Sequence, residues 1–164
     1  MKEVLLVDGY NVINAWPELL ELSLAQARAK LYDLLASYAH YRDIELILVF
    51  DAHLRMDPES VEYGPITEVF TASGETADRY IERTVRALQG EGRSISVASS
   101  DALIQIMVLN YARRMSAREL IADISKARKE LEDAYLSPLS RRRGTLEQRL
   151  GSAHLAAFER MRRE

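Results

Sequence analysis

Three short apolar runs constrain the fold of this chain more than any other feature of its sequence. They cover residues 2–7 (KEVLLV), 44–50 (IELILVF) and 94–98 (SISVA). Continuous apolar runs of this length are typical of strands buried on both faces, as in a parallel sheet. A fourth segment, residues 66–71 (ITEVFT), alternates in polarity and predicts an edge strand.

Segments with helical spacing of apolar residues separate and follow these strands. They cover residues 24–41, 75–89, 102–111, 116–135 and 144–163. Ser23 is a candidate N-cap of the first, and Ser116 with Glu119 forms a capping-box pattern at the start of the fourth. Residues 56–65 carry two prolines and a glycine and predict a loop. Strands that alternate with helices predict an α/β fold with a mainly parallel central sheet flanked by helices.

Length and composition predict one cytoplasmic domain. The chain has 164 residues and no cysteine, which fits a reducing compartment. The apolar run at the N-terminus is too short for a signal peptide, and no segment approaches the roughly 20 apolar residues of a membrane span. We therefore expect no membrane association.

The net charge of −3 hides a division along the chain. Residues 1–111 hold 9 basic and 17 acidic residues, a net charge of −8, whereas residues 112–164 hold 13 basic and 8 acidic residues, a net charge of +5. A basic C-terminal third indicates an anionic partner, although basic helices also occur simply because they are soluble.

Acidic side chains follow each of the predicted strands. Asp8 ends the first, Asp51 the second, and Asp101 follows the third after two serines. Glu75 and Asp78 follow the fourth and lie three residues apart, which predicts that they share one side of a helical turn. Because ligands of open α/β sheets bind at the carboxyl ends of the strands, we expect these acids to meet at one edge.

Clustered carboxylates repel one another, and a divalent cation relieves that repulsion. Mg²⁺ or Mn²⁺ suits oxygen ligands and is commonly held by one or two carboxylates and a substrate phosphate. Such a site hydrolyses phosphodiesters without a protein nucleophile. Taken singly, each acid could instead be a helix cap or a turn residue.

Several motifs together resemble one known family. They are VDGYNVINAWPEL, LVFDAH, ETADRYIE, VASSD and RRMSARELIADI, and they span residues 3 to about 125. In combination they resemble the YacP-like branch of the NYN nucleases, within the larger PIN-like group. The glycine that often precedes the basic segment of that family is replaced here by Asn110-Tyr111.

The resemblance implies a PIN-like three-layer fold with a C-terminal helical extension. Because Ser137-Pro138 ends the preceding helix and residues 137–144 are the candidate linker, we expect a nuclease domain over residues 1–136, followed by a basic loop and a helix over residues 137–164. The implied activity is that of a metal-dependent endoribonuclease, of a ribosome-associated type that cuts messenger RNA during translation. The residues implied as catalytic acids and metal ligands are Asp8, Asp78 and Asp101, with less certain roles for Asp51 and Glu75. We expect Asp51 to be a metal ligand, and Glu75 to bind the metal through water or to act as a base.

Other residues near the predicted acids have two interpretations each. Asn11 could hydrogen-bond a phosphate or orient Asp8, or it could be a helix N-cap. Gly9 lets the backbone pass close to the site or is a turn glycine. Trp16 could stack on a base or pack over the first helix. Ser100 is expected to cap the helix that begins near residue 101.

Candidate RNA-binding residues lie mainly in the basic third of the chain. Arginines at a helix start are suited to phosphate, and a basic loop is suited to an RNA backbone, although both also occur as solvated charge. A histidine near the acids could contact the scissile phosphate or could be a packing residue. These candidates are Arg113, Arg114, Arg118, Arg141, Arg142, Arg143 and His53.

The residues leave two other functions open. The chain could be a non-catalytic RNA- or ribosome-binding module on the same fold, in which the basic segments bind and the acids do no chemistry. It could also be a phosphatase of a small phosphate ester, a reading that the basic C-terminal third disfavours. Expected partners are RNA and the ribosome, and no nucleotide cofactor is expected.

Overall fold

The computed structural model describes residues 1–52, 59–63 and 66–136 of the chain. By its contacts the chain divides into two compact units, Met1–Ser125 and Lys126–Glu164. The predictions for His53, Arg141, Arg142 and Arg143 and for the helix over residues 144–163 lie outside the described residues. The domain boundary expected at residue 136 stays a prediction.

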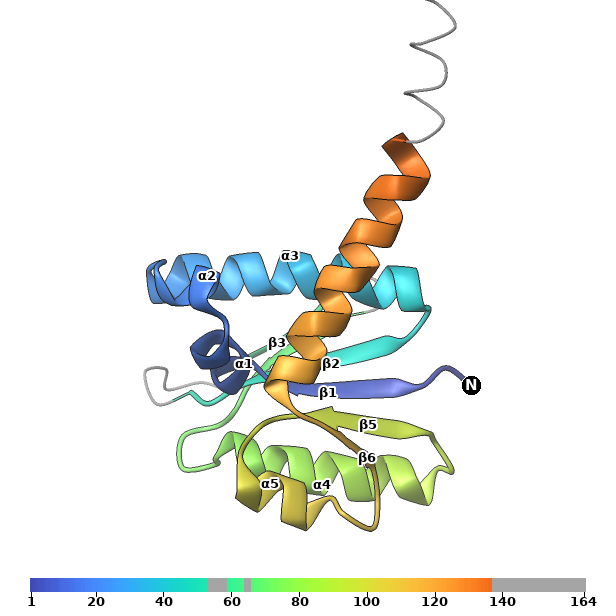
Figure 1. Ribbon diagram of the computed structural model, residues 1–164. Helices are drawn as coiled ribbons and strands as arrows, with labels where there is room; N and C mark the ends of the chain where they lie inside the picture. The colour runs from blue at the N-terminus through green and yellow to red at the C-terminus, as the bar shows by residue number, and fades with distance from the viewer. Residues whose placement is uncertain (53–58, 64–65, 137–164) are drawn as a thin grey trace, which may run out of the picture. The chain divides into compact units, whose positions relative to one another are not determined.

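A single mixed sheet forms the centre of the first unit (Figure 1). Its strands are β1 (Val4–Asp8), β2 (Glu45–Phe50), β3 (Glu59–Tyr63), β4 (Ile66–Phe70), β5 (Ile95–Ala98) and β6 (Arg113–Met115). They lie in the order β3-β4-β2-β1-β5-β6, and every neighbouring pair is parallel except β3 and β4. The predicted α/β class is therefore confirmed. Strand β1 lies between β2 and β5, the two other strands with a continuous apolar sequence.

Helices cover both faces of this sheet. They are α1 (Gly9–Ala15), α2 (Pro17–Leu20), α3 (Leu24–Arg42), α4 (Ala77–Gly90) and α5 (Ala102–Met107), followed by a helix over residues 117–136. Figure 1 shows α3 on one side of the sheet and α4 with α5 on the other. In the described ranges no helix is both long enough and apolar enough to cross a membrane.

The apolar runs are continuous because both faces of the central strands are covered. All five residues of β1 are buried. Val4 and Leu6 belong to a core with Ile81 of α4 and Ile104 of α5, and the alternation of a strand directs the intervening Leu5 to the opposite face. Each fully buried aliphatic side chain contributes about 1.5–3 kcal/mol.

Three expectations about the elements were wrong. The predicted loop over residues 56–65 contains β3, which pairs with β4, so the strand over residues 66–70 is not at the edge. The three-residue β6 extends the opposite edge, within a segment that sequence alone indicated only as basic. Both edge strands, β3 and β6, lack an apolar run, and they are held by backbone hydrogen bonds to β4 and β5. Helix α5 ends at Met107 rather than at residue 111.

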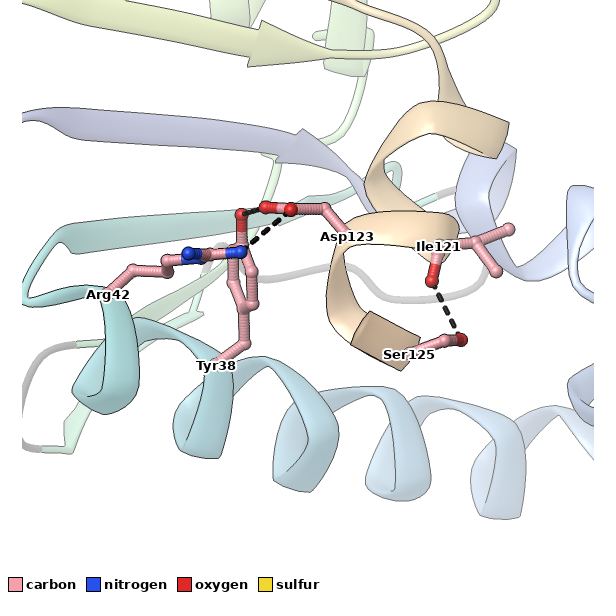
Figure 2. Close-up of polar contacts among 5 residues, drawn as sticks. All are labelled: Tyr38, Arg42, Ile121, Asp123 and Ser125. Atoms are coloured by element: carbon pink, nitrogen blue, oxygen red, sulfur yellow. Dashed lines mark hydrogen bonds and ion pairs between the residues drawn. The ribbon is translucent and has the colours of Figure 1, made fainter. Parts of the chain in front are cut away.

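The helix over residues 117–136 is fixed at its start by the predicted capping box. The Glu119 backbone N–H donates to Ser116 Oγ at 3.1 Å, and the Ser116 N–H donates to Glu119 Oε2 at 3.2 Å. Two turns along, Asp123 accepts a hydrogen bond from the Tyr38 hydroxyl and forms an ion pair of 2.8 Å with Arg42 (Figure 2). This helix and α3 are therefore joined by a charged cluster.

Candidate active site

Asp8 is a buried carboxylate at the end of the central strand, with 9% of its surface exposed. Burial, and then the charges of Asp78 and Asp101, raise the pKa of Asp8 from 3.8 to about 6. The Ser99 hydroxyl, which donates to Asp8 Oδ2 at 3.1 Å, and the Asn11 backbone N–H act in the opposite direction on this pKa. A carboxylate that is costly to ionise is a candidate functional group.

The other predicted aspartates lie close enough to act on one another through their charges. Asp51 directly follows β2, Asp101 is the N-cap of α5, and Asp78 lies in the first turn of α4. Burial raises the pKa of Asp78, and the charges of Asp101 and Asp51 raise it further. The structure therefore brings these acids together with Asp8 at the carboxyl edge of β1, β2 and β5, as the strand pattern predicted.

Glu75 does not share a helical turn with Asp78. Thr76 caps α4, because its hydroxyl accepts the Arg79 N–H at 3.3 Å, so the helix begins at residue 77 and Glu75 precedes it. The Glu75 carboxylate forms an ion pair with Arg83 at 2.7 Å. The expectation of a shared helical face was wrong, and the role of Glu75 as a base stays a prediction.

Asn11 joins the two turns that carry Asp8 and Asp101. It lies inside α1, whose N-cap is Asp8, so its interpretation as an N-cap was wrong. Its side-chain Oδ1 accepts the Ser100 backbone N–H at 2.7 Å. In the same turn, the Ser99 hydroxyl accepts the Asp101 N–H at 3.1 Å while it donates to Asp8. The Ser99 hydroxyl therefore contacts both the Asp8 carboxylate and the backbone of Asp101.

Ser99 is a site residue that sequence reasoning missed. It is 1% exposed, and Gln105 of α5 donates from Nε2 to its carbonyl oxygen at 2.9 Å. Ser100 was expected to cap α5, but Asp101 takes that position and the Ser100 hydroxyl accepts the Ala117 N–H at 3.0 Å. The sequence signal that could have identified Ser99 is the Ser99-Ser100 pair, which lies between a buried strand and Asp101.

Gly9 is required by a neighbouring ring and not by a turn. It is the first residue of α1, and a Cβ there would lie 2.3 Å from Cε1 of the buried Phe50. The Phe50 ring packs against Tyr10 and Phe70, with centroids 4.9 and 5.5 Å away. Trp16 is also buried, at 5% exposure, which confirms its packing role.

The donor chemistry fits a hard divalent cation that keeps part of its water. Within the described ranges, no three histidine or acidic side chains are arranged to hold a metal ion directly. The acids supply only oxygen ligands, however, and Mg²⁺ commonly binds through one or two carboxylates together with waters and substrate phosphates. Asp8, Asp51, Asp78 and Asp101 therefore fit a hydrated ion better than a closed cage, and their assignment as ligands stays a prediction.

Three of the predicted RNA-binding arginines lie in the described part of the chain. Arg113 and Arg114 are on β6, which pairs with β5, and Arg118 lies in the first turn of the helix over residues 117–136. All three are exposed. They are therefore accessible to a polyanion, and RNA binding by them stays a prediction.

The fold and the acidic edge define the class of this protein. It is an α/β domain with a mainly parallel sheet flanked by helices and with aspartates at or after the ends of three of its parallel strands. A profile of the YacP-like NYN domain matches residues 5–163. The chain belongs to the YacP-like NYN family, and the resemblance in its motifs is confirmed.

Relatives of known sequence and structure agree with this assignment. The chain is 40% identical over 135 residues to the uncharacterized protein YacP of Bacillus subtilis, covering 79% of each chain. It is similar to the crystal structure of Rae1 (YacP) from Bacillus subtilis, with a TM-score of 0.72 and 34% identity over 98% of this chain and 95% of that one. A point mutant of the same protein matches with a TM-score of 0.73 and 35% identity over 84% of each chain.

Proposed function

We propose that this chain is a divalent-metal-dependent endoribonuclease that hydrolyses phosphodiester bonds in RNA. The observation that carries the proposal is the buried Asp8, whose pKa is raised to about 6 by burial and by the charges of Asp78 and Asp101. Membership of a nuclease family supports the reaction class. A non-catalytic binding module would have no use for this costly arrangement of charge.

Three of the acids would hold the metal ion together in the proposed site. A divalent ion, when bound, supplies positive charge for the scissile phosphate and lowers the pKa of water. Asp8 would hold it from the central strand, with its carboxylate oriented by Ser99, and Asp78 and Asp101 would hold it from α4 and α5. Asn11 keeps the turn before Asp101 in register with β1 through its 2.7 Å hydrogen bond to Ser100.

The substrate proposed is RNA, and more narrowly messenger RNA in the context of the ribosome in the cytoplasm. The exposed Arg113, Arg114 and Arg118 support a polyanionic substrate, because contacts with phosphates dominate nucleic-acid affinity. The narrower part of the proposal comes from the family resemblance. It is tested separately, by comparing cleavage of one transcript free in solution and during translation.

Cleavage of a labelled RNA with Mg²⁺, with Mn²⁺ and with EDTA tests the reaction. We expect cleavage only with metal, and we expect Asp8→Asn to lower its rate by at least about a hundredfold, since a lost charge contact in a transition state costs several kcal/mol. Asp33→Asn, an exposed carboxylate of α3, is the matched control and should cleave like the wild type.

A thermal-shift titration gives a second readout that does not depend on activity. Mg²⁺ should raise the melting temperature of the wild type and of Asp33→Asn, and should raise that of Asp8→Asn much less. Cleavage in EDTA, or a fully active Asp8→Asn variant, would contradict the proposal. RNA binding that Arg113→Ala with Arg114→Ala abolishes, without cleavage by any variant, would favour the binding module.

A further inference from the structure

Large apolar side chains are exposed along α5 and the turn that follows it. Leu103 is 56% exposed, Ile106 68%, Leu109 51% and Tyr111 38%. Leu103 and Ile106 lie three residues apart on a helix, so they share one side of α5, while Ile104 is fully buried in the core. An exposed apolar patch of this kind usually marks an interaction site.

Positively charged residues follow this uncharged apolar stretch, on β6 and at the start of the next helix. Residues 102–118, called here the α5 segment, contain three arginines and no acidic residue. In the preceding residues 1–101, by contrast, 17 acidic residues outnumber 9 basic ones. The guanidinium of Arg86 in α4 lies 5.7 Å from the centroid of the Tyr111 ring, and its charge is shared with Glu82 through an ion pair of 2.8 Å. The α5 segment therefore combines apolar surface with positive charge.

This combination fits single-stranded RNA better than it fits another protein chain. An unpaired strand presents flat apolar base faces together with a row of phosphates, so it needs apolar or aromatic contacts beside cations. The three arginines and the absence of acidic residues between residues 102 and 118 favour a polyanionic partner. The charge of the segment is thus complementary to RNA.

The α5 segment also begins at the acidic site. The Leu103 backbone N–H donates to Asp101 Oδ1 at 2.8 Å. The first large exposed apolar side chain of the segment therefore belongs to a residue whose backbone contacts a proposed metal ligand. A strand bound along the segment would have its phosphates close to Asp101.

We propose that the α5 segment is the platform that binds the RNA strand next to the cleavage site. Bases contact the exposed apolar side chains, and phosphates contact the arginines. The residues assigned to bases are Leu103, Ile106, Leu109 and Tyr111, and those assigned to phosphates are Arg113, Arg114 and Arg118. This inference deepens the proposed function and rests on it.

Binding of a short, unstructured, fluorescein-labelled RNA tests the platform, measured by fluorescence anisotropy in EDTA so that cleavage does not interfere. The double variant Leu103→Ser with Ile106→Ser should bind about fivefold more weakly or worse, a loss of about 1 kcal/mol, because it removes apolar surface that the platform places against the bases. The matched control is Leu20→Ser with Leu24→Ser, which removes leucines 55% and 42% exposed at α2 and at the start of α3. It should bind like the wild type.

The salt dependence of binding separates the two kinds of contact. The apolar double variant should weaken binding equally at every salt concentration, because it removes no phosphate contact. Arg113→Ala with Arg114→Ala should instead lower the slope of log Kd against log salt by about one to two. Ile106→Ser alone, at the most exposed of these positions, repeats the test if the double variant is unstable.

Three outcomes would overturn the platform. One is that the Leu103→Ser with Ile106→Ser variant binds RNA as tightly as the wild type does. If the wild type also cleaves RNA, the proposed function still holds in that case. Another is a change of oligomeric state in that variant, by sedimentation, with unchanged RNA affinity, which would assign the patch to a second copy of the chain. The third is loss of ribosome association alone, which would assign it to a protein or ribosomal surface. If the wild type neither binds nor cleaves RNA, the proposed function fails as well.

Discussion

At the scale of single residues, Asp8 is the one polar side chain in an otherwise apolar central strand. The strand VLLVD is buried throughout, so its carboxylate loses most of its hydration on folding. Among the described residues, the Ser99 hydroxyl and the Asn11 backbone N–H lower its pKa against that loss and against the charges of two neighbouring aspartates. Asp8 therefore costs stability in the absence of a cation.

This cost should depend on pH. With a pKa of 3.8 when unfolded and about 6 when folded, Asp8 carries no penalty below about pH 4, and the full penalty is present above about pH 6. The free energy of unfolding from this group therefore falls as pH rises through this range. Without metal, Asp8→Asn should stabilise the protein by up to about 3 kcal/mol near pH 8 and hardly at all near pH 4.

Urea denaturation in EDTA at the two pH values measures this effect. Asn keeps a side-chain oxygen that can accept the Ser99 hydroxyl, so the substitution removes the charge with little change of shape. Asp33→Asn on the exposed side of α3 should change stability little at either pH. A destabilised Asp8→Asn protein near pH 8 would show that the carboxylate is not penalised by burial.

Gly9 is a second residue whose identity is dictated by its surroundings. A methyl group at this position would overlap the Phe50 ring, which is fully buried and cannot move away freely. Gly9→Ala should lower the free energy of unfolding by about 1–3 kcal/mol, the usual cost of overpacking. Gly90→Ala is the control, because nothing lies within 4 Å of the added carbon in α4. It should be neutral or stabilising by up to about 1 kcal/mol in the same urea titration.

At the scale of elements, the cluster in Figure 2 joins α3 to the helix over residues 117–136. Tyr38 is 5% exposed, and burial, followed by its hydrogen bond to Asp123, raises the pKa of its hydroxyl to about 12. Tyr38→Phe should lower the free energy of unfolding by about 1–2 kcal/mol, since Asp123 keeps its ion pair with Arg42. Tyr135→Phe, at a site 73% exposed, is the control and should have no effect on the denaturation midpoint.

The elements with strong local patterns were predictable, and those formed by pairing were not. Strands β1, β2 and β5 and helices α3 and α4 lie close to where apolar periodicity placed them, and Ser23 caps α3 through a complete capping box. Strands β3 and β6 carry no such pattern, because an edge strand needs only a backbone partner. For the same reason the place of β4 inside the sheet could not be read from ITEVF alone.

At the scale of the whole molecule, the strand order creates the candidate site. Because β1 lies between β2 and β5 and all three run in parallel, the residues that follow them meet at one edge. Asp8, Asp51 and Asp101 are far apart in the chain, yet the charges of Asp51 and Asp101 both act on Asp78 between them in sequence. The meeting of these acids was predictable from their positions, since parallel strands place their carboxyl ends together.

The sequence by itself determined the α/β class, the buried strands and the acids that follow them, because local periodicity and strand direction suffice for those features. Only the tertiary structure decided that Glu75 forms an ion pair with Arg83 and that the Ser99 hydroxyl contacts Asp8. It also decided that the face of α5 that carries Leu103 is exposed. These features depend on which side chain reaches which neighbour across the fold. Such contacts are set by packing between distant segments, on which a local pattern carries no information.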